Sequence, residues 1–257
     1  MKIKNILIAA LSILLVSCAG VPSYRHTSNF GMKLSQGKSV YVLPADVEIY
    51  SVDSSNKRER LDNYEYFMED IIKDEATSKL NSINFKAKFL SKRDIHQAKI
   101  SKYLPQLMSD YQVKHSSLYD PKIRTWDKES AENLGIIKIS GLDEFTKNHP
   151  SDFYAIIHYK AYCNTTGSVA LNVMTTILLS SSVNSSAQSP NEDYYLTLSF
   201  IDGKDHNIIW TNSVNVKDFS NFSGLFAPKD FVKYANDHKK HIRNMLDALL
   251  LPLKSSK

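Results

Sequence analysis

The sequence predicts an α/β protein, in the α+β sense, in which helices pack on a mixed or antiparallel sheet. Two long stretches, near residues 62–83 and 228–251, repeat apolar residues at helical spacing. Three stretches, at residues 152–162, 194–201 and 207–216, consist mostly of β-branched and aromatic residues. Because an amphipathic helix must bury its apolar stripe against another element, we expect the helices to cover the sheet.

The N-terminus predicts a lipid-anchored secreted protein. Lys2 and Lys4 precede an apolar run, Ile6 to Val16, that has the length of a secretory signal and is too short to span a bilayer. The run closes on "LVSC", which resembles the lipobox of bacterial lipoproteins. We therefore expect residues 1–17 to be a lipoprotein signal peptide. Cys18 would carry the lipid, with palmitate as a typical acyl group, and hold the chain on a membrane.

The lipobox resemblance also implies a subcellular localisation. Ala19 is not the aspartate that retains enterobacterial lipoproteins at the inner membrane, so the outer membrane, periplasmic face, is expected. The polar residues up to Lys38 are predicted to be a linker behind the lipidated cysteine, giving an anchor-and-linker segment 18–38. Residues 39–257 then form a single periplasmic domain.

The first half of this domain contains two predicted strands and a long helix. "SVYVLP" at residues 39–44 is a strand ended by proline, and residues 47–50 could continue it. Asp62 and Glu65 resemble a capping box at the start of a helix of about 20 residues. "FKAKF" at residues 85–89 alternates apolar residues with lysine, so it is expected to be a strand with one face in water.

A less regular region follows. Ser91 and Asp94 open a helical pattern that Pro105 is expected to interrupt. A further helix is predicted over residues 126–134, ended by Gly135, with a loop before it.

The second half is predicted to contain a strand at 152–162, a hairpin from 194–201 and 207–216, and the last helix at 228–251. Asp202, Asp205 and His206 are expected to be turn residues of that hairpin. His238 and His241 lie three apart on the last helix, a spacing that could hold a metal, but no third ligand matches and His238 falls on the apolar stripe. We expect packed histidines there.

An uncharged segment separates the first of these strands from the hairpin. Although 23% of the residues are charged, residues 161–191 contain no charge, and "GSVALNVMTTILLSSS" at 167–182 is the most apolar internal run. Its apolar side chains fit both strand and helix periodicity. Three interpretations remain open, namely packing in a core or subunit interface, contact with a lipid surface, and a membrane-spanning hairpin. The residues expected to make that contact are Val169, Leu171, Val173, Ile177 and Leu179.

Composition excludes several classes of function. The net charge is +5, and two of these positive charges, on Lys2 and Lys4, are removed with the signal peptide. So small a positive charge does not indicate a nucleic-acid-binding surface. With Cys18 lipidated, Cys163 has no partner for an intrachain disulfide and is expected to be a buried thiol. No serine sits between the glycines of a nucleophile elbow, and no glycine-rich dinucleotide motif follows a strand. No catalytic residue, metal ligand or cofactor is therefore predicted.

The order of the C-terminal pieces resembles a group of poorly characterised bacterial lipoproteins related to the curli-export lipoprotein family. Asp152 at the start of a strand, an apolar insertion, Asp202, and Ile209 with Trp210 at the end of the hairpin match that pattern. The resemblance implies a domain like the N-terminal domain of the translocation protein TolB, and it supplies no catalytic residues. This chain departs from the pattern in the early position of Gly203 and in lacking two clear membrane hairpins.

These observations lead to one expected function and two alternatives. The first is a non-enzymatic outer-membrane lipoprotein that acts as a structural, assembly or export-associated component of the envelope. It would self-associate or dock on an envelope complex through residues 167–182. The alternatives are a lipoprotein regulator of a peptidoglycan synthase, which needs a linker that reaches the cell wall, and a periplasmic hydrolase.

Overall fold

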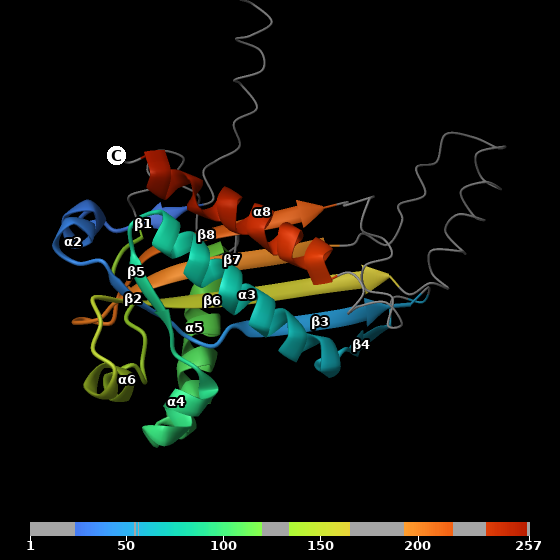
Figure 1. Ribbon diagram of the computed structural model, residues 1–257, viewed down its shortest axis with the longest axis horizontal. Helices are drawn as coiled ribbons and strands as arrows, with labels where there is room; N and C mark the ends of the chain where they lie inside the picture. The colour runs from blue at the N-terminus through green and yellow to red at the C-terminus, as the bar shows by residue number, and fades with distance from the viewer. Residues whose placement is uncertain are drawn as a thin grey trace, which may run out of the picture.

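The computed structural model describes residues 24–53, 55, 57–119, 134–164, 193–217 and 235–255, and within them it confirms the α/β fold, with helices on a mixed sheet (Figure 1). The strands are β1 (Arg25–His26), β2 (Ser39–Val42), β3 (Asp46–Val52), β4 (Arg58–Arg60), β5 (Lys86–Phe89), β6 (Phe153–Asn164), β7 (Asp193–Asp202) and β8 (Ile208–Lys217). The helices are α2 (Phe30–Gln36), α3 (Asp62–Ser82), α4 (Lys92–Gln97), the 3-10 turn η1 (Ser101–Tyr103), α5 (Leu104–Tyr119), α6 (Asp143–Asn148) and α8 (Ala235–Ser255).

The sheet is organised around β6. Its main path runs β1-β8-β7-β6-β2-β5, and β3 also pairs with β6. β7 and β8 are antiparallel to their neighbours, as the predicted hairpin requires, whereas β2 runs parallel to β5 and β6, and β3 runs parallel to β6. β4 pairs antiparallel with β3 at the edge. The sheet is therefore mixed, and the long strand β6 joins its antiparallel half to its parallel half.

Strands β2 and β3 follow one another along the same edge of β6. β2 pairs with the first residues of β6, and β3 pairs with the rest of it, from Asp46 opposite His158 to Val52 opposite Asn164. Pro44 lies between the two strands because proline has no N–H to donate to the ladder. The expected continuation at 47–50 is thus confirmed, as a seven-residue strand.

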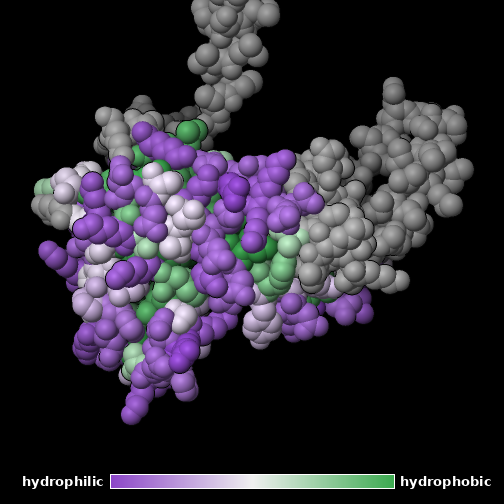
Figure 2. Space-filling view, viewed as in Figure 1, coloured by the Kyte–Doolittle hydropathy of each residue, from purple (hydrophilic) through white to green (hydrophobic). Residues whose placement is uncertain are grey.

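One face of the sheet is covered by α3 and α8, which lie side by side across it (Figure 1). Both helices present the apolar stripe that their sequences predict. Figure 2 shows that their outward surfaces are mainly hydrophilic. The core beneath them includes fully buried side chains from helices and strands, among them Ile72, Leu80, Tyr159, Leu196, Trp210, Leu246 and Leu249. Cys163 is buried in β6, as expected.

A second core lies on the opposite face. It is formed where α5 packs with residues of α4 and α6 against the first residues of β6 and against the β7–β8 turn. Tyr154 and Ile156 of β6 contribute to it, together with Leu107 and Tyr111 of α5. The Tyr111 hydroxyl lies 2.8 Å from the Ser199 hydroxyl of β7, which fixes α5 to the sheet.

The turn between β7 and β8 is held by the residues predicted for it. Asp202 Oδ1 accepts hydrogen bonds from the backbone N–H groups of Lys204 (2.8 Å) and Asp205 (3.1 Å). Gly203 lies against the start of β6, where an added Cβ would be 2.0 Å from the Ser151 carbonyl oxygen. Only glycine fits there, which explains the early glycine of this turn.

The linker expected up to residue 38 is wrong for residues 24–38. β1 pairs antiparallel with β8, with His26 opposite Trp210, and Phe30 of α2 is buried in the core under α3 and α8. The polar composition of this stretch concealed two short elements whose stability comes from tertiary contacts and not from their own pattern. The domain therefore begins at least fifteen residues before Ser39.

Two helix starts differ from the prediction, and one agrees with it. At α3 the N-cap is Leu61, whose aliphatic side chain cannot cap, and Glu65 binds Arg60 and the Ile49 N–H. The Asp62 capping box is thus wrong. At α4 the Ser91 and Asp94 capping box forms in both directions. Pro105 does not interrupt a helix, because it is the second residue of α5, where a missing N–H costs nothing.

Several predictions lie outside the described residues. These are the signal peptide 1–17, Cys18, the helix at 126–134, the apolar segment 167–182 and the first residues of the C-terminal helix. Where α8 is described, it extends past the expected end at Leu251 and contains Pro252 in its last turn. In the described part of the chain, no helix combines the length and apolarity needed to cross a membrane.

Candidate functional site

The chemically richest group of side chains lies on the half of the second face that α5 leaves uncovered. β3 and β6 pair so that Asp46 is opposite His158, Glu48 opposite Lys160 and Tyr50 opposite Tyr162. Alternation along a strand puts these six residues on one face, while the residues between them point into the core under α3 and α8. We call this surface the β3–β6 polar face.

At the α5 end of the polar face, Asp46 is the centre of a hydrogen-bonded group. Its Oδ2 lies 2.8 Å from His158 Nδ1 and also accepts from the side-chain amide of Gln112 on α5. Burial opposes the charged carboxylate, but the hydrogen bond and charge of His158 outweigh it, so the pKa of Asp46 lies below its ordinary value. Asp46 is thus kept ionised, so its carboxylate accepts hydrogen bonds and does not donate a proton.

The next pair along the strands, Glu48 and Lys160, also forms an ion pair. Glu48 Oε2 lies 2.7 Å from Lys160 Nζ and accepts from the Tyr50 hydroxyl at 3.1 Å. Burial again disfavours the charge, and the hydrogen bond and charge of Lys160 reverse that effect, so the pKa of Glu48 is lowered. Lys160 keeps its proton for the same reason, since contact with Glu48 outweighs burial and raises the lysine pKa.

The far end of the polar face is aromatic and cationic. The rings of Tyr50 and Tyr162 stack with centroids 5.5 Å apart, and Tyr195 of β7 meets Tyr162 edge-on at 6.5 Å. The Arg58 guanidinium of β4 lies 4.5 Å from the centre of the Tyr162 ring. Tyrosine and arginine are enriched at protein interfaces because they offer large contact area and directional polar groups together.

The polar face does not fit a metal well. Within the described residues, Asp46, Glu48 and His158 form the one group whose ligand atoms come within 4.8 Å of each other. However, each of these atoms already has a donor or a cation, and the Lys160 ammonium beside Glu48 would repel a second cation. Each carboxylate already has partners within the protein, so the arrangement is better suited to binding by hydrogen bonds and ring contact than to metal or acid–base chemistry.

The sequence singled out different site residues. Cys18 and the five residues Val169, Leu171, Val173, Ile177 and Leu179 lie outside the described residues. The two strand ends that their segment connects are nevertheless described. The segment leaves the sheet after Asn164 and returns at Asp193, whose backbone pairs with Tyr162. Both ends of the segment therefore lie at the aromatic end of the polar face.

The residues that carry the family resemblance have structural roles. Asp152 Oδ2 accepts from the N–H of Lys38 (3.0 Å) and from the N–H (2.9 Å) and hydroxyl (2.6 Å) of Ser39, which ties β6 to β2. Asp202 holds its turn and pairs with Lys33 of α2 at 2.8 Å. Ile209 and Trp210 are buried in the core. None of the four lies on the polar face.

The two histidines of α8 are packed, as expected. His238 meets the Phe67 ring edge-on at 6.2 Å, and His241 meets the Tyr194 ring edge-on at 5.0 Å. Burial, together with the charge of His238, lowers the pKa of His241 to about 4. Sequence reasoning missed the polar face because its residues are spread over β3, α5 and β6, and only the pairing of β3 with β6 brings them together.

Comparison with known proteins leaves the family undefined. No protein-family model matches the sequence, and no curated protein matches it. A solved PelC dodecamer from Paraburkholderia phytofirmans is 9% identical, with a TM-score of 0.34 over 83% of this chain and 89% of that chain. A neuraminyllactose-binding hemagglutinin homolog from Helicobacter pylori is 9% identical, with a TM-score of 0.36 over 82% of this chain and 85% of that one.

The LpoB C-terminal domain from Salmonella enterica is 11% identical, with a TM-score of 0.25 over 75% of this chain and 96% of that domain. At such scores the similarities define neither a family nor a function for this chain. What the fold and the polar face define is a class, namely an α/β protein with a mixed sheet whose one face is covered by α3 and α8 and whose other face, among the described residues, is covered only in part, by α5 and the short helices beside it.

Proposed function

We propose that this protein is a non-enzymatic lipoprotein of the bacterial envelope that acts as a structural or assembly component. Its anchor is the lipid on Cys18, and its address is the periplasmic face of the outer membrane. The basic start, the short apolar run and the "LVSC" sequence support the anchor. The domain that follows binds a second copy of itself or an envelope complex.

One observation carries the binding role. The most apolar internal segment connects two adjacent, directly paired strands. The 28 residues between Asn164 and Asp193 are far more than a hairpin connection of two to five residues requires. We infer that Val169, Leu171, Val173, Ile177 and Leu179 of this segment make the intermolecular contact, beside the tyrosines of the polar face.

The side chains of the polar face support a non-enzymatic role. A general acid or base needs a proton that can move at working pH, and a nucleophile needs an activated group. Asp46 and Glu48 are instead held ionised by His158 and Lys160. These contacts count against the periplasmic-hydrolase alternative.

The length of the tether counts against the alternative of a peptidoglycan-synthase regulator. Because β1 begins at Arg25, only residues 19–23 separate Cys18 from Tyr24. Fully extended, the step from Cys18 to Tyr24 covers roughly 21 Å, against roughly 70 Å for a linker of 20 residues. A domain held this closely is suited to partners at the membrane and not to partners in the cell wall.

The anchor is tested in cells with the full chain. Labelled palmitate should be incorporated into the wild-type protein and not into Cys18→Ser, and the wild type should fractionate with the outer membrane. Cys163→Ser is the matched control, because that thiol is buried in β6 and should not change labelling. Equal incorporation into wild type and Cys18→Ser would contradict the anchor.

The assembly role is tested on the full chain purified in mild detergent. Light scattering with the detergent mass subtracted should give an oligomer for the wild type and a monomer for the double variant Val173→Ser, Ile177→Ser. Val113→Ser is the matched control, since Val113 is an exposed apolar residue on α5 and is no part of the segment. A monomeric wild type that also keeps its cross-linked envelope partners after the double substitution would reject the proposal.

A further inference from the structure

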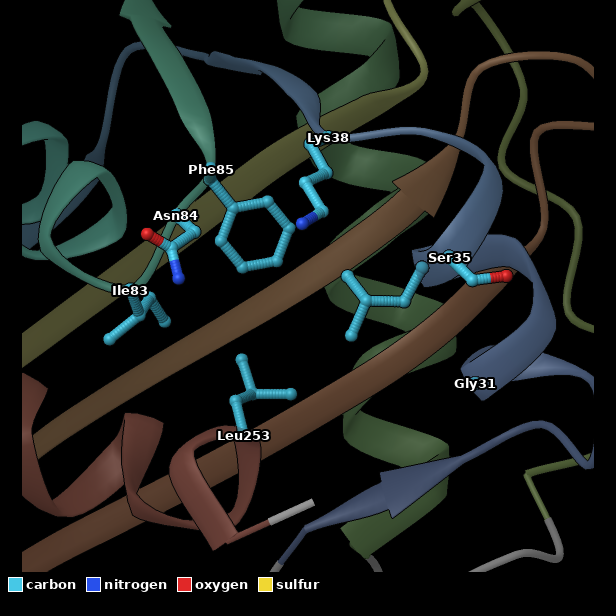
Figure 3. Close-up of a pocket in the computed structure, with 8 residues that line it drawn as sticks. Gly31, Ser35, Lys38, Ile83, Asn84, Phe85 and Leu253 are labelled. Carbon is cyan, nitrogen blue, oxygen red and sulfur yellow. The ribbon is translucent and has the colours of Figure 1, made fainter. Parts of the chain in front are cut away.

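A hollow of about 220 Å³ lies at one corner of the molecule, between α2, the turn from α3 to β5, and the last turn of α8 (Figure 3). Its walls are mainly apolar, with Leu34, Ile83, Phe85 and Leu253 among the lining residues. In Figure 3 the side chains of Phe85 and Leu253 point into the hollow from opposite sides. A site of this size is smaller than the roughly 300–1,000 Å³ that takes a drug-sized molecule.

A cation lies at the rim of this hollow. Lys38 is an exposed residue whose side chain extends over the hollow in Figure 3. Its ammonium forms no ion pair with any carboxylate in the described part of the chain, and the nearby Asp152 is occupied by backbone N–H groups and the Ser39 hydroxyl. The hollow thus combines an apolar interior with a lysine at its rim.

Two exposed apolar side chains lie on the helices that help to form the hollow. Met32 of α2 is 57% exposed and Leu251 of α8 is 63% exposed. Large exposed apolar residues on the helices of an apolar hollow with a lysine at its rim are the composition of a surface that meets the interfacial region of a membrane. A small polar ligand would leave both of these residues in water.

The position of the corner in the chain points to the same partner, and this step rests on the proposed anchor at Cys18. Gly31, which lines the hollow, lies seven residues after Tyr24, and Tyr24 lies at most roughly 21 Å from Cys18. The lipid would therefore hold α2 and the end of α8 near the bilayer surface.

We propose that this corner docks on the membrane and that the hollow takes the end of one acyl chain of an anionic phospholipid, with Lys38 pairing with its phosphate. The contact fixes the orientation of the domain on the bilayer, because anchor and hollow are two separate points of attachment. The polar face is then free to meet a protein partner.

The test uses the full-length protein in vesicles of phosphatidylethanolamine and phosphatidylglycerol that contain phosphatidylglycerol with a diazirine near the end of one acyl chain. After irradiation, we expect cross-links in peptides that carry residues 30–38, 83–86 and 251–254. Gly31→Leu should reduce them roughly tenfold, as a loss of about 1.4 kcal/mol in binding does. A Cβ at Gly31 meets no atom within 4 Å, so this variant should fill the hollow and keep the fold.

Lys38→Glu tests the charge at the rim and should reduce labelling by the anionic lipid several-fold. Its control is Lys57→Glu, at another exposed lysine, and the control for Gly31→Leu is Ser109→Leu, at an exposed position of α5. Neither control should change the labelling. Thermal unfolding of all four variants, compared with wild type, shows whether the fold is kept.

Three outcomes would overturn the inference. They are cross-links spread evenly over the chain, labelling that Gly31→Leu leaves unchanged in a folded protein, and equal labelling by phosphatidylcholine carrying the same diazirine chain. The anchor is read separately, from palmitate at Cys18. Palmitate without cross-links in the hollow rejects this inference alone, and cross-links without palmitate reject the proposed anchor alone.

Discussion

The two faces of the central sheet are built from the same strands and yet differ in how they are completed. On β6, Tyr159 and Ala161 are fully buried beneath α3 and α8, while their neighbours Lys160 and Tyr162 are half-buried on the other face. Along β6 the covered face is apolar throughout. The other face of β6 is apolar at Tyr154 and Ile156, which belong to the core under α5, and polar from His158 onward.

This difference shows that the extent of the covering helix decides where a strand changes from core to surface. A polar group costs free energy when it is buried without a partner, so a polar residue beneath a helix needs a hydrogen-bond partner there, as Ser199 has in Tyr111. The covered face is expected to supply most of the stability. The polar face is expected to supply contacts whose loss the fold tolerates.

The largest expected effect compares two tyrosines of β6. Tyr159→Ala should lower the free energy of unfolding by about 3–5 kcal/mol, because it empties a fully buried site. Tyr162→Ala should lower it by less than about 1 kcal/mol, because that ring is half-exposed. Urea unfolding measures both, and similar losses would contradict the distinction between the faces.

The second effect concerns pH. Burial lowers the pKa of His241 to about 4 in the folded protein, whereas an unfolded histidine titrates near 6.5. The contribution of neutral His241 to the free energy of unfolding is fully present above pH 6.5. Below that pH the unfolded chain binds a proton that the folded chain does not bind, so the contribution decreases until about pH 4. Between pH 7.5 and 5 the loss should be on the order of 2 kcal/mol.

Denaturant titrations at several pH values measure this loss, and His241→Leu should remove its share of the slope. The matched control is His96→Gln, at an exposed position on α4. His115 of α5 has a pKa lowered to about 4 by burial and by the charge of His158, so a residual slope of the same sign should remain. A rise in stability on acidification would contradict the buried, neutral state of these histidines.

The third effect tests the connection between the two covering helices. Arg243 of α8 binds Glu75 of α3 through two hydrogen bonds, of 2.9 and 2.8 Å, and Glu75 is 8% exposed. Arg243→Met should lower the free energy of unfolding clearly more than the control below, since it leaves a buried carboxylate without its cation. Lys73→Met, which breaks a pair with the exposed Asp70, should cost much less. Calorimetric unfolding compares the two, and equal costs would show that burial of Glu75 is unimportant.

The smallest effect lies on the polar face. Lys160→Met removes the cation beside Glu48 but leaves the Tyr50 hydroxyl as a donor. We expect a loss of about 0.5–1 kcal/mol that shrinks at high salt. A loss above that of Arg243→Met would mean that the polar face is part of the structural core. Binding is the more sensitive measurement, because Lys160→Met should weaken cross-linking to the envelope partner while the protein stays folded.

Much of the fold could be predicted from periodicity. Helices α3 and α8 and the β7–β8 hairpin were expected because each carries its signal within one segment. The capping box of Asp62 failed for a related reason. Its partner Glu65 accepts hydrogen bonds from Arg60 and from the Ile49 N–H instead. The spacing of Asp62 and Glu65 alone does not reveal these competing donors. Residues 24–38 looked like a linker because β1 and α2 are stabilised by β8 and the core rather than by their own pattern.

The sequence by itself determined the α/β class, the helix stripes, the hairpin and the apolar segment at 167–182, and it led us to propose the anchor at Cys18. These features are local, since each depends on residue spacing within a short stretch. Only the tertiary structure decided that Asp46, Glu48, His158 and Gln112 meet, that Lys38 lies over an apolar hollow, and that α5 leaves half of one sheet face uncovered. Those arrangements depend on strand pairing and helix placement between distant segments, which local spacing does not encode.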